Sequence, residues 1–124
     1  MRTRRQEYVA KIFEQVSRVR EEHKKKYGSL AHRLPALVRT AGLAQALAFV
    51  EARGKEAGQQ LLQDIAEVVG VGNREALLKR SREAKLLEYM DLTRRVLATL
   101  DWYRRFAQSV LKVEAGDDRE GDRG

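Results

Sequence analysis

Residues 86–106 read LLEYMDLTRRVLATLDWYRRF, and this stretch decides the fold class. Its apolar side chains recur three and four positions apart, which is the spacing of one face of an α-helix. The pattern begins behind Asn73, a plausible N-cap residue, and a break in the helix would fall near Ser81. The sequence thus predicts a long C-terminal helical stretch that ends at residues 115–116. Its inward face is expected to consist of Leu86, Met90, Thr93, Val96, Leu97, Leu100, Tyr103, Phe106 and Val110.

The same spacing continues outward from this stretch toward the N-terminus. It predicts helices over residues 3–26, 29–40, 43–52 and 57–69. No segment shows the alternation of apolar and polar residues that a half-buried strand requires.

Glycine and proline mark the predicted helix boundaries. The tripeptide at residues 27–29, Tyr-Gly-Ser, is interpreted as a C-cap followed by a new N-cap. Pro35 lies inside the second helix, where proline removes a backbone donor, so we expect a buried kink or a restart there. Gly42 closes that helix, and the Gly-Val-Gly-Asn run at residues 70–73 is the clearest turn.

Together these elements predict an all-α fold, a compact bundle of five to six helices with long first and last helices. The chain has 124 residues and only one proline, and strong helix formers dominate it. A chain of this size can bury one core without staples. We expect residues 1–116 to form a single helical domain and residues 117–124 to form an acidic disordered tail.

The composition excludes several classes of protein. The chain has no cysteine, which leaves no disulfide and no thiolate metal site. No stretch approaches the roughly 20 apolar residues of a membrane span. The basic N-terminal residues are not followed by the apolar segment of an export signal. We therefore expect a cytoplasmic protein that does not associate with a membrane.

A search for catalytic residues finds no reactive set, so we expect no enzyme, no metal and no cofactor. The surroundings of the two histidines, His23 and His32, hold no matching catalytic set of cysteine, serine or acid residues. The glycines at residues 70–72 lack the strand and the lysine of a phosphate loop. An enzyme built on scattered acids such as Asp64 and Glu67 stays open at this point.

The charge balance favours an acidic partner. The net charge is +7, and residues 114–124 carry five acids and two bases, which leaves +10 on residues 1–113. Nucleic acid, an acidic protein face and an anionic membrane are all compatible with a basic surface. On the first predicted helix the bases follow acids at the i,i+4 spacing, so we interpret that face as self-paired: Glu7–Lys11, Glu14–Arg18 and Glu21–Lys25.

The last predicted helix carries bases in excess of acids. Arg94, Arg105 and Lys112 fall near one line of a helix, about 27 Å long, with Arg95 and Arg104 beside it. Only Asp91 and Asp101 lie nearby, and we expect Asp101 to pair with Arg104 or Arg105 but not fully with both. The sequence thus predicts a row of unpaired guanidinium groups. Such a row can follow a phosphate backbone, or it can serve solubility and protein contacts.

Two stretches of the chain resemble a known family. Residues 26–49, KYGSLAHRLPALVRTAGLAQALAF, are similar to the signature of the small helical subunit of type III-B (Cmr) CRISPR effector complexes. The family pattern has a tyrosine, a leucine-proline within a helix, and a glycine-leucine-x-glutamine-alanine-leucine-alanine-phenylalanine run. Residues 97–107, LATLDWYRRFA, resemble the family's C-terminal helix. Ala41 departs from the pattern, because a polar residue is expected there, and a side-chain cap at that position is in doubt.

The resemblance implies a non-catalytic role in antiviral defence. In such complexes, copies of the small subunit stack beside the backbone subunits and meet the large subunit. A basic face lines the channel that holds the target RNA paired with the guide RNA, while another subunit cuts the target. The implied partners are thus backbone and large effector subunits, neighbouring copies of the chain, guide RNA and target RNA.

We expect basic residues of the first, second and last predicted helices to contact RNA. Two rival functions remain open: a stand-alone RNA- or DNA-binding protein without sequence preference, and a scaffold that binds protein alone. The candidate nucleic-acid-binding residues are Arg94, Arg95, Arg104, Arg105, Lys112, Arg33, Arg39, Lys24 and Lys26.

Overall fold

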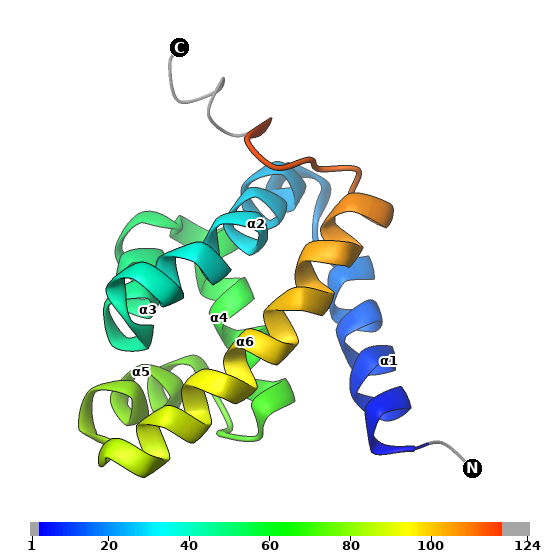
Figure 1. Ribbon diagram of the computed structural model, residues 1–124. Helices are drawn as coiled ribbons and strands as arrows, with labels where there is room; N and C mark the ends of the chain where they lie inside the picture. Colours follow the sequence, from blue (N-terminus) through cyan, green and yellow to red (C-terminus); the bar gives the residue numbers. More distant parts are fainter. Residues whose placement is uncertain (1–2, 118–124) are drawn as a thin grey trace.

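The computed structural model describes residues 3–117, which form six α-helices and one short 3₁₀-helix and contain no strand (Figure 1). The all-α prediction is confirmed. The predicted acidic tail lies, apart from Asp117, outside the described residues. In chain order the elements are α1 (Arg4–Ser17), η1 (Glu21–His23), α2 (Lys24–Ala41), α3 (Leu43–Arg53), α4 (Lys55–Val69), α5 (Arg74–Glu83) and α6 (Leu86–Ser109).

Helix α6 is the longest element and runs diagonally across the molecule (Figure 1). It packs against α2, α1, α4 and α5. In the view of Figure 1, α1 lies on one side of it, α3 and α5 lie on the other, and α4 passes behind it. Because α6 touches elements from both ends of the chain, its side chains hold much of the core together.

The inward face of α6 differs from the predicted one in its first two turns. From Leu92 onward the buried positions recur three and four apart: Val96, Leu100 and Tyr103 were predicted to face inward, whereas Leu92 and Ala107 were not. Leu86 and Met90 were expected to be buried, but they are 71% and 55% exposed. Tyr89 faces the protein instead, and its hydroxyl accepts a hydrogen bond from the Ala44 backbone N–H at 3.2 Å.

The predicted first helix over residues 3–26 is wrong, because α1 ends at Ser17 and α2 begins at Lys24. Val19, in the segment between them, is buried in the core. The predicted boundary at residues 27–29 is also wrong, since these residues lie buried inside α2. Gly28 is needed there for close packing, because a Cβ at this position would lie 2.7 Å from Cβ of Val113.

Pro35 does not restart the second helix, which runs unbroken from Lys24 to Ala41. Gly42 ends it as predicted, with a φ of 89° that favours glycine. The break predicted near Ser81 occurs a few residues later, between Glu83 and Leu86. Ser81 itself is buried, and its hydroxyl donates to the Leu78 carbonyl at 2.7 Å.

The last helix ends at Ser109 and not at residues 115–116 as predicted. The chain then turns back over α2, which buries Leu111 and Val113. The Val113 N–H donates to the Ala107 carbonyl at 2.9 Å, and the Val113 carbonyl lies 2.8 Å from Nε2 of His32. Burial of these two apolar side chains against α2 competes with continuation of the helix and outweighs it.

Candidate nucleic-acid interface

The basic residues of α6 occur in two short units, each with one aspartate followed by two arginines. The first unit is Asp91, Arg94 and Arg95, and the second is Asp101, Arg104 and Arg105. Arginines three and four residues after an aspartate lie on the same face of a helix as the carboxylate. Each unit therefore places two guanidinium groups beside one acid and keeps a net charge of +1.

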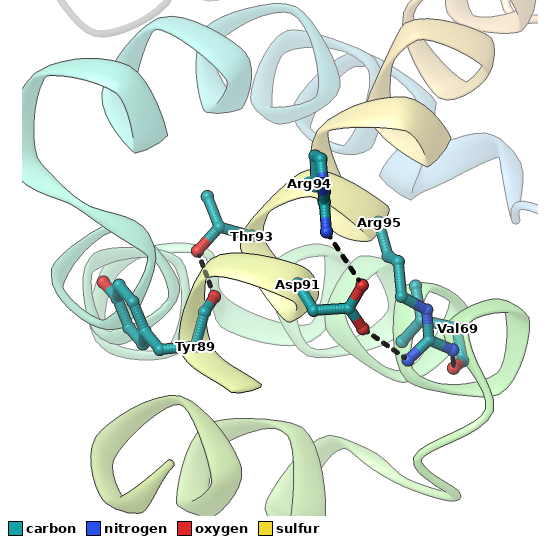
Figure 2. Close-up of polar contacts among 6 residues, drawn as sticks. All are labelled: Val69, Tyr89, Asp91, Thr93, Arg94 and Arg95. Carbon is teal, nitrogen blue, oxygen red and sulfur yellow. Dashed lines mark hydrogen bonds and ion pairs between the residues drawn. The ribbon is translucent and has the colours of Figure 1, made fainter. Parts of the chain in front are cut away.

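Figure 2 shows the first unit, in which Asp91 lies between both arginines. Its Oδ1 accepts from Nη2 of Arg94 at 3.2 Å, and its Oδ2 lies 3.9 Å from Nη1 of Arg95. The Arg94 side chain is 78% exposed. It can thus reach a ligand in solvent while it keeps its contact with Asp91.

Arg95 has a second contact that ties it to the fold. Its Nη2 donates to the backbone carbonyl of Val69, the last residue of α4 (Figure 2). The carbonyls of the last helical turn lack partners within their own helix and need an outside donor. Arg95 supplies that donor and links α6 to the C-terminus of α4. The predicted RNA contact at this position therefore competes with a structural one.

In the second unit we expected Asp101 to pair with Arg104 or Arg105 but not fully with both, and the structure places both guanidinium groups beside this carboxylate. Its Oδ1 accepts from Arg104 at 2.8 Å, while its Oδ2 lies 3.2 Å from Nη2 of Arg105. The hydrogen bond from Arg104 and the positive charges of Arg105 and Arg39 hold the pKa of Asp101 below its usual value. The prediction of unpaired guanidinium groups on α6 is therefore wrong, because each carboxylate oxygen serves a different arginine.

The basic row is also shorter than predicted. Lys112 lies beyond the end of α6, in the turn that follows, with a φ of 61°. The row therefore runs from Arg94 to Arg105, about 16 Å along the helix axis. The two aspartates are ten residues apart, which rotates one unit by about 80° from the other around the axis. The units consequently face different directions.

Two helices bring arginines to the surface around Asp101. Arg39 of α2 lies near enough to lower the pKa of Asp101, and both residues line a hollow together with Arg104. We call Arg39, Asp101, Arg104 and Arg105 the Asp101 cluster. Its net charge is +2, and it joins predicted site residues from two helices, whereas both arginines of the first unit come from α6 alone.

Helix α1 adds a residue that the sequence analysis did not single out. The Arg5 guanidinium lies 5.9 Å from the centre of the Trp102 ring, and that of Arg105 lies 4.7 Å from it. Both are within the range of a cation–π contact. No pattern within residues 3–26 could have found Arg5, because its position depends on how α1 packs against α6.

The remaining candidates make other contacts. The Arg33 guanidinium lies 5.9 Å from the centre of the Phe49 ring of α3. Lys24 pairs with Glu21 at 2.8 Å, where the sequence had predicted Lys25 as the partner of Glu21. Lys26 is half-buried, and Lys112 is exposed. None of the contacts named here joins these residues to the Asp101 cluster.

The acids considered for an enzyme lie near a buried polar network. The Tyr27 hydroxyl donates to Asp64 at 2.6 Å, and the Gln60 amide donates to it at 2.8 Å. Gln15 donates to the Asp64 backbone carbonyl at 3.0 Å and accepts from the Tyr103 hydroxyl. Burial raises the pKa of Asp64 to about 6, against the effect of its hydrogen bonds. The network joins α1, α2, α4 and α6, which accounts for a polar core without invoking catalysis.

Two further searches bear on the class of site. Within residues 3–117, no group of three or more histidines, cysteines or acids could hold a metal ion. None of the helices the structure describes is both long enough and apolar enough to cross a membrane. Nε2 of His23 lies 3.2 Å from Oε2 of Glu56.

Comparisons with known proteins give a consistent result. The family described as CRISPR-associated protein (Cas_Cmr5) matches residues 4–110. The CRISPR system Cmr subunit Cmr5 of Thermus thermophilus is 47% identical over 113 residues, which cover 90% of this chain and 99% of that protein. The X-ray crystal structure of a CRISPR-associated Cmr5 family protein from Thermus thermophilus is similar with a TM-score of 0.76 at 47% identity. That match covers 89% of this chain and 98% of the other.

Proposed function

This chain belongs to the Cmr5 family of CRISPR-associated proteins, and on that premise we propose that it is a non-catalytic subunit of a Cmr (type III-B) CRISPR complex. In this proposal it acts in the cytoplasm, in antiviral defence. It stacks beside the backbone subunits, next to other copies of itself and the large subunit. Its basic surface faces the channel that holds the guide RNA and the target RNA.

The observation that carries the RNA contact is the Asp101 cluster. Three arginines from two packed helices surround one carboxylate and leave an excess of two positive charges on the surface. An arginine has five N–H donors, so Arg104 and Arg105 can each keep Asp101 and still donate to a phosphate. The carboxylate then fixes the direction of the guanidinium groups, which lowers the entropy lost when RNA binds.

The remaining predicted residues contribute in this proposal as outlying phosphate contacts. Arg94 is highly exposed and lies at the other end of the row, whereas Arg33, Lys24, Lys26 and Lys112 enlarge the positive field. Backbone contacts of this kind position a nucleic acid but do not read its sequence. Specificity in the complex would come from pairing between guide and target.

A second observation favours contacts with protein subunits. The first two turns of α6 expose three large apolar side chains: Leu86, Leu87 and Met90. Exposed apolar side chains that lie together mark interaction sites more often than chance. This patch and the Asp101 cluster lie at different ends of α6, so one helix could contact both a protein neighbour and RNA.

The test measures target-RNA affinity of the assembled complex over a salt series. Replacing Arg104 and Arg105 with alanine should flatten the log–log slope by roughly 1.4 if both touch phosphate of a single strand. The matched control replaces Arg80 and Arg82 of α5, which are exposed and carry the same charge. An unchanged slope in the Arg104 and Arg105 variant would leave the scaffold function. Tight binding of RNA by the chain without other subunits would favour the stand-alone function.

A further inference from the structure

A groove with an aromatic floor lies between α1 and α6, directly beside the Asp101 cluster. It is lined mainly by Arg5, Val9, Phe13, Trp102 and Phe106, and it has a volume of about 770 Å³. The proposed function leaves this groove unused, because phosphate contacts need only the arginines. Its apolar lining therefore calls for a different kind of ligand group.

Three aromatic rings from the two helices meet in the groove. The Phe106 ring lies 5.4 Å from Phe13 in an edge-on arrangement and 5.8 Å from Trp102 in a tilted one. Trp102 and Phe106 are only partly buried, and Phe13 is 48% exposed. Aromatic side chains are normally placed where their large apolar area is buried, so exposed rings in one groove indicate a surface that is covered when a ligand binds.

The charges around the rings favour a polyanion over an apolar protein segment. Trp102 follows Asp101 in the chain, and the guanidinium groups of Arg5 and Arg105 lie 5.9 Å and 4.7 Å from its ring. Arg4 and Arg5 line the adjoining hollow with Trp102. The nearby acids are engaged, Asp101 by Arg104 and Arg105, and Glu14 by Arg18 at 3.4 Å.

We propose that an unpaired base of an RNA strand stacks in this groove while the adjoining phosphates lie against Arg5 and Arg105. Flat aromatic side chains bordered by cations are the combination that holds single-stranded nucleic acid. The inference rests on the proposed RNA contact and adds the base as a second recognised group. Any base can stack, because every base presents a flat π-face to an aromatic ring.

The chain offers a direct probe, since Trp102 is its single tryptophan. The purified chain is titrated at low salt with a uridine oligomer and with an abasic oligomer of the same length and charge. We expect the uridine strand to quench Trp102 fluorescence and to bind several-fold more tightly than the abasic strand, since stacking contributes to affinity. Binding of both strands with equal affinity and without quenching would overturn the inference and leave the phosphate contacts intact.

Variants of Phe13 distinguish the contribution of its flat ring from that of its apolar volume. Phe13→Leu keeps apolar volume but removes a flat ring, and Phe13→Ala removes both; each should lose the preference for the uridine strand. Phe49→Leu, which makes the same change at a ring that is 37% exposed and does not line the groove, is the matched control and should keep it. Thermal melting of each variant reports whether the chain is still folded. Retention of the preference by the folded Phe13→Leu chain counts against stacking.

If the free chain binds neither strand, base stacking in the groove is tested in the assembled complex. Target RNA carrying 5-iodouridine at successive positions is irradiated in the complex, and the crosslinked peptides are sequenced. Crosslinks to Phe13, Trp102 or Phe106 support the inference. Their absence overturns it, as does coverage of the groove by another protein subunit. The salt slope of the Arg104 and Arg105 variant, measured in the same complex, tests the proposed function separately.

Discussion

The hydroxyl of Tyr27, a fully buried residue of α2, donates a 2.6 Å hydrogen bond to Asp64 of α4, which is itself 3% exposed. Burial disfavours the charged carboxylate and raises its pKa to about 6, while the hydrogen bonds from Tyr27 and Gln60 oppose that shift. The folded chain thus holds a proton on Asp64 at a pH where the unfolded chain has lost it.

This difference predicts a pH-dependent stability with a definite sign. The contribution of Asp64 to the free energy of unfolding should be fully present below roughly pH 4 and should be lost as the pH rises through about 6. A shift of that size corresponds to about 2–3 kcal/mol. Urea unfolding at several pH values should show this slope in the wild type and not in Asp64→Asn, which stays neutral. Parallel curves for the two chains would contradict it.

Gly28 and Val113 predict a steric effect. A Cβ at Gly28 would lie 2.7 Å from Cβ of Val113, so Gly28→Ala must displace the segment that follows α6. We expect a loss of about 1–3 kcal/mol in the free energy of unfolding, as for other overpacked cores. The double variant Gly28→Ala, Val113→Ala should recover part of it. Equal stability of the single variant and the wild type would show that this segment moves freely.

The two arginines of the first unit should respond differently to truncation. Arg95→Ala removes the donor to the Val69 carbonyl at the end of α4, so we expect about 0.5–1.5 kcal/mol of destabilisation. Arg94→Ala removes only a pair with Asp91 at the surface and should change stability by less than about 0.5 kcal/mol. Chemical unfolding of both variants under the same conditions checks the order. The reverse order would mean that the contact with α4 carries little energy.

Neutralising the shared acid should strengthen RNA binding. Asp101→Asn adds one positive charge to the Asp101 cluster and keeps a side chain that can accept from Arg104. We expect higher target-RNA affinity for the complex and a steeper salt dependence. Asp91→Asn, in the corresponding position of the first unit, is the comparison. Weaker binding of Asp101→Asn would indicate that the orientation of Arg104 and Arg105 matters more than the added charge.

Local signals were sufficient where a helix boundary depends on its own residues. The end of α4 was predicted from Gly70, which takes the left-handed conformation, and the start of α5 from Asn73, which accepts from the Ala76 N–H at 2.8 Å. The end of α1 could not be predicted in this way. No glycine or proline occurs among residues 3–26, and the buried Ile12, Val16 and Val19 keep the helical spacing across the end of α1, so this boundary depends on the packing of the whole chain.

The candidate site was predictable only in part, for the same reason. The sequence identified Arg104 and Arg105 from their density on one helix. It could not show that both arginines contact Asp101, because the side-chain rotamers determine which carboxylate oxygen each guanidinium group contacts. Arg39 was among the predicted RNA-binding residues, but nothing in the sequence placed it near Arg104 and Arg105. Arg5 was not among the predicted residues. Their positions follow from the packing of α2 and α1 on α6.

Helix α6 carries both arginine units and is held by contacts with four other helices. The distance between Arg94 and Arg105 is therefore fixed by the pitch of a helix that cannot bend without disturbing the core. An RNA strand that engages both units has to match that spacing to within the reach of the exposed Arg94 and Arg105 side chains. In the proposed stack of subunits, α6 would therefore fix the spacing between successive phosphate contacts along the filament.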